Sequence, residues 1–231
     1  VSVNGTAKRP EELPSYLLAQ NADQNLNQVY SSTAANDASA IASSATPANS
    51  NVIYLSATQS VALHASAQVQ ANGTTGGSIY LSAPIIDAQA GSVVQANGNN
   101  GPGGAITFQT INNQVINNAQ LQANGSGNGG NIQITTTSGD INLQSALIQT
   151  NGANGRGGQI AVAATNYTSL ESSTVEASGN TQGGTIKVGY DAQTQTLPFS
   201  IFTNLDAPSI LSASQTNPSN TTNGGYIETS G

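Results

Sequence analysis

The stretch LQANGSGNGGNIQI, residues 121–134, contains the two patterns that decide the fold. It begins with an apolar residue followed by Gln, a small residue, Asn and Gly. A Gly-Gly pair, one further residue and an alternation of apolar and polar residues follow. This alternation has a period of 2, which is typical of a strand with one buried face. Gly and Asn between the two patterns indicate a corner, so the stretch predicts two short strands joined by a glycine-rich turn.

Both patterns recur in register along the chain. The Gly-Gly pairs are spaced 27, 26, 28, 26 and 41 residues apart, and they begin at Gly76, Gly103, Gly129, Gly157, Gly183 and Gly224. A third, looser apolar patch lies between successive copies, as at Ile141 and Leu143. A unit of three short strands cannot bury its own apolar face, whereas stacked units bury a continuous core. The sequence therefore predicts an all-β, three-sided parallel β-helix with about 26–28 residues per coil.

Side-chain directions follow from the period of 2. Ile79, Leu81 and their equivalents in other copies should point inward, and Ile79, Ile106, Ile132 and Ile160 should form a single interior file. One corner column has an amide in four successive coils, and we expect these side chains to stack as a structural ladder. The ladder residues are Asn72, Asn97, Asn124 and Asn151.

The repeat also predicts how the chain is divided. Residues 1–51 do not join the register and are expected to be an irregular N-terminal segment, either a cap or a divergent coil. Residues 52–231 are expected to form the shaft, with a lateral excursion at about 189–208 that accounts for the long last spacing. The excursion is rich in aromatic residues: it is either a loop packed on the shaft or a site of ligand contact. Its candidate contact residues are Tyr190, Phe199 and Phe202.

Composition disfavours several classes of function. The chain has 4 Lys and Arg, 11 Asp and Glu, one His and no Cys, and its formal net charge is −7. Nucleic acid is not an expected partner, because phosphate binding needs clustered cations. No apolar run approaches the roughly 20 residues of a membrane span. The repeat register aligns no pair of carboxylates as hydrolases require, so we expect no enzyme, no catalytic residue, no metal and no cofactor.

The recurring units Gly-Gly-x-Ile-x-Val and apolar-Gln-Ala-Asn-Gly resemble those of filamentous-haemagglutinin-type exoproteins of bacterial two-partner secretion. The run Gly224-Gly225-Tyr226-Ile227-Glu228-Thr229-Ser230-Gly231 resembles a recurrent Gly-Gly-aromatic-apolar-Glu-Thr-Ser-Gly run of that family. The resemblance covers about residues 52–231. It implies a right-handed parallel β-helix and passage through an outer-membrane β-barrel transporter. The family's Asn-Pro-Asn motifs are missing from this sequence, so the chain resembles shaft rather than the segment that the transporter recognises.

The function expected from repeat and resemblance is the structural shaft of a secreted adhesin at the bacterial cell surface. Such a shaft would mediate attachment, or contacts within fibres and the biofilm matrix. The partners implied are a host surface, a polysaccharide or other adhesin copies, reached through the outward Gln column or the aromatic excursion. The alternative is a β-helix enzyme that acts on polysaccharides, a lyase or a tailspike-like hydrolase, which would need converging carboxylates in a surface groove.

Overall fold

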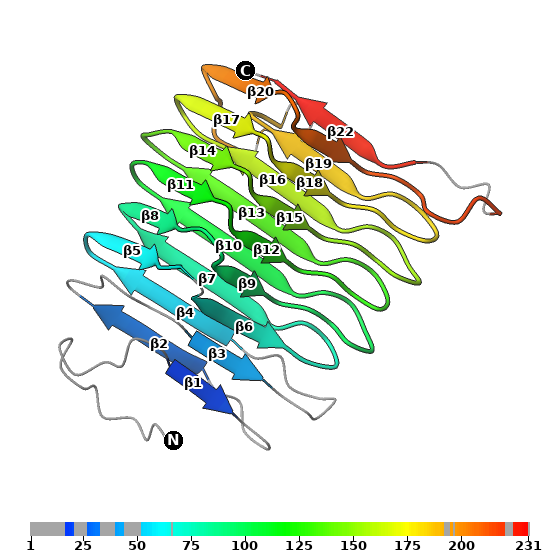
Figure 1. The fold of residues 1–231 in the computed structure, drawn as a ribbon, viewed down its shortest axis with the longest axis horizontal. Helices are drawn as coiled ribbons and strands as arrows, with labels where there is room; N and C mark the ends of the chain where they lie inside the picture. Colours follow the sequence, from blue (N-terminus) through cyan, green and yellow to red (C-terminus); the bar gives the residue numbers. More distant parts are fainter. Residues whose placement is uncertain are drawn as a thin grey trace.

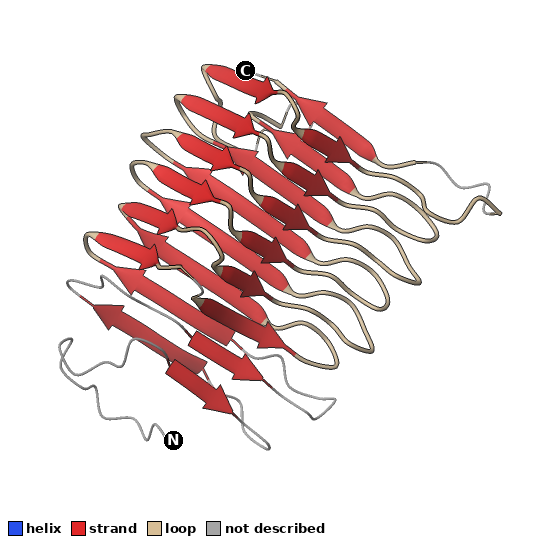
Figure 2. Cartoon of the chain, in the orientation of Figure 1, coloured by secondary structure: helices blue, strands red, loops and turns tan. Residues whose placement is uncertain are grey.

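The computed structural model describes residues 17–20, 27–32, 40–43, 52–65, 67–191, 195, 197–219 and 224–230, with the backbone alone for the first three ranges. The regular secondary structure in these ranges consists of β-strands, which are joined by turns and loops (Figure 2). The strands follow one another around three sides of a solenoid and stack coil upon coil along its axis (Figure 1). The predicted three-sided parallel β-helix is thereby confirmed.

Three parallel sheets, named A, B and C, form the sides. Sheet A contains, in order, β1 (Leu17–Gln20), β3 (Ala40–Ser43), β6 (Gln68–Asn72), β9 (Val93–Gln95), β12 (Gln120–Gln122), β15 (Leu147–Gln149), β18 (Thr174–Glu176) and β21 (Ile210–Ser212). Sheet B contains β2 (Asn27–Ser32), β4 (Val52–Ala57), β7 (Ser78–Ala83), β10 (Ala105–Thr110), β13 (Asn131–Thr136), β16 (Gln159–Ala163), β19 (Thr185–Val188) and β22 (Tyr226–Thr229). Sheet C contains β5 (Ser60–Leu63), β8 (Ile85–Ala88), β11 (Gln114–Asn117), β14 (Ile141–Gln144), β17 (Tyr167–Glu171) and β20 (Phe202–Asp206).

The interior file that the repeat predicts is present on the inner face of sheet B. Ile79, Ile106, Ile132 and Ile160 are register partners in successive coils, and each is at most 1% exposed. The file continues to Ile53 on one side and to Ile186 on the other. Each strand alternates buried and more exposed positions, as β7 does along Ser78–Ala83. The period of 2 in the sequence is therefore the period of burial.

Two stretches outside the regular repeat also supply strands. Within the predicted N-terminal segment 1–51, β1 and β3 continue sheet A, and β2 pairs with β4 in sheet B. The rest of that segment lies outside the described residues. Within the predicted excursion 189–208, β20 pairs with β17 and continues sheet C. The excursion therefore leaves the shaft after Val188 and returns to it at Phe202.

The inner face of sheet C contains a polar position that the sequence does not predict. Gln114 is the register partner of Ile86 and Ile141, and it is 1% exposed. Neither its Nε2 nor its Oε1 has a hydrogen-bond partner among the described residues. A buried amide without partners costs about 1–3 kcal/mol.

We therefore expect Gln114→Ile to raise the free energy of unfolding by about 1–3 kcal/mol. Isoleucine suits this position because the same column has Ile in the coils on either side. Urea unfolding followed by circular dichroism measures the change. The control is Gln120→Ile, at an exposed position of β12, where the gain should be small. A loss of stability in Gln114→Ile would mean that the amide has a buried partner such as water.

Candidate functional site

The predicted Asn ladder occupies the corner that follows sheet A. The Oδ1 atom of Asn72 accepts a hydrogen bond from the backbone N–H of Asn97 at 2.7 Å. In the same way, Asn97 Oδ1 accepts a bond from the backbone N–H of Asn124 at 2.8 Å. Asn124 Oδ1 accepts one from the backbone N–H of Asn151 at 2.7 Å. The column ends where Asn151 receives the backbone N–H of Ser178 at 2.8 Å. Each side chain thus bonds to the backbone of the next coil and fastens consecutive corners.

A second ladder, in which side chains bond to side chains, lies two residues earlier on the outer face of sheet A. Gln95 donates to Gln122 at 2.7 Å, Gln122 to Gln149 at 3.0 Å, and Gln149 to Glu176 at 2.9 Å. The sequence analysis suggested the outward Gln column as a ligand surface. In the structure, the side chains of this column form hydrogen bonds with one another. Amides that already bond to one another have less capacity for a ligand.

Glu176 ends the Gln column as a hydrogen-bond acceptor. Burial by itself would raise the pKa of this carboxyl group. The hydrogen bonds that the carboxylate receives from Asn151, Gln149 and Ser178 outweigh burial, so its pKa is lowered. A folded-state pKa below the unfolded one stabilises the fold at neutral pH, and this contribution is lost as the pH falls through the lowered pKa.

We expect Glu176→Gln to be less stable than the wild type at neutral pH by less than about 1 kcal/mol, since the carboxylate is partly exposed. This difference should shrink on acidification below about pH 4.3, where glutamates protonate. Free energies of unfolding measured across acidic pH check the expectation. Glu171→Gln on sheet C, outside the ladder, is the control. A difference that stays constant with pH would contradict the assignment.

The three candidate contact residues of the excursion lie in two separate ring pairs. Tyr190 packs edge-on against Phe199, with ring centroids 4.9 Å apart. Phe202 packs against Tyr167 of sheet C, with centroids 5.9 Å apart. Phe199 is 59% exposed and Phe202 is 53% exposed. These rings therefore pack as two pairs, and they stay candidates for ligand contact.

The excursion is anchored to the shaft by Ser200. This residue is fully buried; its Oγ lies 2.7 Å from Thr168 Oγ1 and donates to the carbonyl of Ala164 at 3.0 Å. Gly189 begins the excursion with a φ of +92°, a conformation that favours glycine. These contacts set the position of the excursion beside sheet B.

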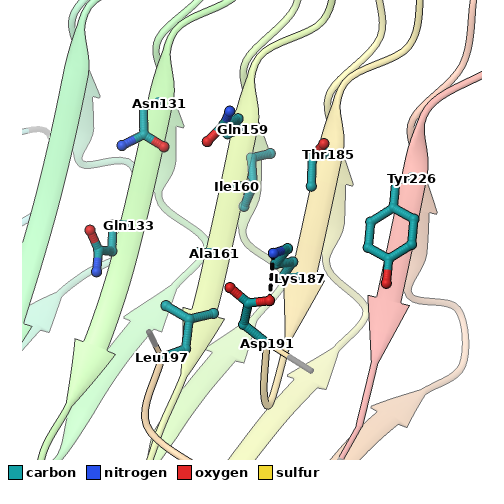
Figure 3. Close-up of a pocket in the computed structure, with 10 residues that line it drawn as sticks. All are labelled: Asn131, Gln133, Gln159, Ile160, Ala161, Thr185, Lys187, Asp191, Leu197 and Tyr226. Atoms are coloured by element: carbon teal, nitrogen blue, oxygen red, sulfur yellow. Dashed lines mark ion pairs between the residues drawn. The ribbon is translucent and has the colours of Figure 1, made fainter. Parts of the chain in front are cut away.

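A groove lies where the excursion meets the outer face of sheet B (Figure 3). Its volume is about 610 Å³, and its floor spans β13, β16, β19 and β22. Asp191 and Leu197 of the excursion form its wall. The floor residues are Asn131, Gln133, Gln159, Ile160, Ala161, Thr185, Lys187 and Tyr226. None of the three predicted aromatic residues lines this groove.

The charges in the groove neutralise each other. Lys187 Nζ lies 2.6 Å from Asp191 Oδ1, and this ion pair joins the floor to the wall (Figure 3). The Tyr226 hydroxyl donates a hydrogen bond to Glu228 at 3.1 Å. Desolvation and this bond both raise the pKa of Tyr226, so its ring is neutral at physiological pH. The groove presents a paired cation, neutral amides and one aromatic ring.

The sequence analysis did not predict this groove. The missing information was the wall, because residues 189–201 follow no repeat. A weak local signal existed in Lys187 and Asp191, which stand four residues apart and have opposite charges.

The described residues also place two carboxylates at neighbouring positions. Glu171 of β17 and Asp206 of β20 are register partners on sheet C, a pair that the repeat did not predict because the excursion precedes β20.

The part of the chain described here contains no group of three or more His, Asp and Glu that could hold a metal ion. Within the same residues, no helix has the length and hydropathy to cross a membrane.

No protein-family model matches the chain, and comparisons with curated proteins and with solved structures find no significant match. The class of the protein is therefore defined by its fold: it is a three-sided parallel β-solenoid.

Proposed function

We propose that the chain is a shaft and display segment of a secreted bacterial cell-surface adhesin. The observation that supports this most is the unbroken parallel pairing of eight strands in both sheet A and sheet B. At about 4.8 Å between neighbouring strands, eight strands cover roughly 34 Å of axis. Since each coil bonds to its two neighbours, length is added without a hinge, and a surface on the shaft is held away from its base.

The two side-chain ladders support the same function. The Asn column fastens the corners, and the Gln column fastens the outer face of sheet A. A shaft under tension along its axis has to resist separation of its coils, and these columns add bonds to those of the backbone. The repeat units and their resemblance to filamentous-haemagglutinin-type exoproteins favour an adhesin. From that resemblance we infer that the β-helix is right-handed and that an outer-membrane β-barrel transporter exports the chain to the cell surface.

Electron microscopy of the native secreted material tests the proposal. We expect elongated rods or fibres, with an axial repeat of about 4.8 Å in diffraction from aligned material. Compact particles that stay inside the cell would contradict it. The alternative, an enzyme acting on polysaccharide, predicts shortened products from a polysaccharide panel, and such products would replace the proposed function.

A triple variant tests whether the excursion mediates attachment. The triple variant Tyr190→Ala, Phe199→Ala and Phe202→Ala removes the candidate contact rings. If the excursion binds the attachment surface, adhesion should fall while secretion and rod formation persist. Unchanged adhesion would exclude these rings as contact residues.

A further inference from the structure

The amides on the floor of the sheet B groove differ from those of sheet A. The side-chain amides of Gln133 and Gln159 have no hydrogen-bond partner among the described residues, whereas Gln122 on sheet A both donates and accepts. In the register Gln133 stands between Thr107 and Ala161, and Gln159 stands between Asn131 and Thr185, so neither has a second Gln beside it as Gln122 has. Each free amide offers two donors and one acceptor to a ligand.

The groove also has a hollow and an aromatic end. Ala161 stands in the middle of the floor, in a column that has Tyr54 and Tyr80 in earlier coils. The small side chain leaves open the space that a larger one would fill. Tyr226, which is 39% exposed, stands on the last strand of the floor and offers a ring face and a hydroxyl (Figure 3).

From these features we propose that the groove beside the excursion binds a neutral oligosaccharide, with Gln133 and Gln159 bonding to its hydroxyl groups and Tyr226 packing against a sugar ring. Hydroxyl groups need partners that both donate and accept, which amides are. Four strands spaced about 4.8 Å apart give a floor roughly 14 Å long, enough for about three sugar rings. This inference rests on the proposed function, since a groove on a displayed shaft serves attachment.

The charge of the groove favours a neutral ligand over an acidic one. Its one cation, Lys187, is paired with Asp191, which is 2% exposed. An acidic polysaccharide would have to break this pair, and the net charge of −7 on the chain would repel it. The groove has no second cation to compensate among the residues that line it.

Titration of the 231-residue chain with four probes, each used singly, tests the inference. The probes are maltotetraose, cellotetraose, mannotetraose and, as the acidic comparison, tetragalacturonate. We expect at least one neutral probe to bind with a Kd in the millimolar range and to shift the side-chain amide NMR signals of Gln133 and Gln159. No response to any neutral probe would overturn the inference, as would binding of tetragalacturonate alone.

Two groove variants and two controls locate the site. Ala161→Tyr should fill the hollow, and Tyr226→Ala should remove the ring; each is expected to weaken binding by about tenfold or more. Tyrosine at 161 repeats a residue that the same column accommodates at Tyr54 and Tyr80, so the fold should persist. The controls on sheet C, Gln144→Ala and Tyr167→Ala, should bind as the wild type does. Equal binding by Ala161→Tyr and the wild type would overturn the inference.

The groove and the shaft can fail separately. If the probes do not bind but the secreted material still forms rods, the oligosaccharide site is wrong and the shaft function stands. If the material is compact and retained in the cell, the shaft function is wrong whatever the groove binds.

Discussion

Replacing Phe108 with alanine is expected to lower the free energy of unfolding by about 3–5 kcal/mol. Phe108 is fully buried and has the largest side chain among the fully buried residues that the structure describes. Its register partners are Leu81 in the preceding coil and Ile134 in the following one. The hydrogen-bonded backbones of the three coils hold these neighbours in place, so they cannot close the cavity that alanine leaves.

Urea unfolding followed by far-ultraviolet circular dichroism measures the loss. The matched control is Thr107→Ala, one residue earlier on the same strand, where the side chain points outward. That change should cost less than about 1 kcal/mol, the range of strand preference. Equal effects of the two variants would mean that the inner face of β10 is not the core of the solenoid.

Replacing Gly130 with alanine is expected to cost about 3 kcal/mol or more, because the corner has no room for a side chain. A Cβ atom there would lie 2.1 Å from the carbonyl oxygen of Gly104 in the preceding coil and 2.9 Å from that of Ala123. Both obstacles are backbone atoms, so rotation of a side chain cannot relieve the contact. The coils would have to separate, which weakens the bond between coils that Asn131 N–H donates to the carbonyl of Gly104 at 2.9 Å.

Gly127 in the same corner is the matched control. A Cβ atom at Gly127 would meet its nearest neighbour, the carbonyl carbon of Gly101, at 3.5 Å, an ordinary contact. Gly127→Ala should therefore leave stability unchanged or raise it by less than about 1 kcal/mol, since alanine restricts the unfolded chain. Thermal unfolding of both variants is the measurement. If the two glycines tolerate alanine equally, close approach of coils is not the reason for the Gly-Gly pairs.

The close approach of neighbouring coils at the Gly-Gly pairs explains why the repeat can be recognised in the sequence. Each Gly-Gly pair touches the pair of the next coil, as Gly104 meets Gly77 and Gly130 meets Gly104. Every coil therefore needs the same two glycines at the same place, and the Ile that follows keeps its register. The inner file from Ile79 to Ile160 could be predicted for this reason.

The third side was harder to predict. Val115 and Ile116 are consecutive apolar residues, and consecutive side chains on a strand point to opposite faces. The sequence alone does not say which of the two points inward. Pairing of Ile116 with Leu143 decides it: Ile116 is buried, Val115 is 38% exposed, and Gln114 is brought into the core.

The sequence by itself determined the strand period, the corners, the stacking of coils and the column of Asn124, because these features repeat and each copy supports the others. Only the tertiary structure decided the Gln114 position, the separation of Tyr190 and Phe202 into two ring pairs, and the groove. For Gln114 the physical reason is that consecutive apolar residues leave the facing of β11 open until it pairs with its neighbours. For the ring pairs and the groove, the reason is that the excursion stands outside the repeat, so Ser200 and Asp191 are held by particular contacts with Thr168 and Lys187. Such contacts occur once and leave no period to read.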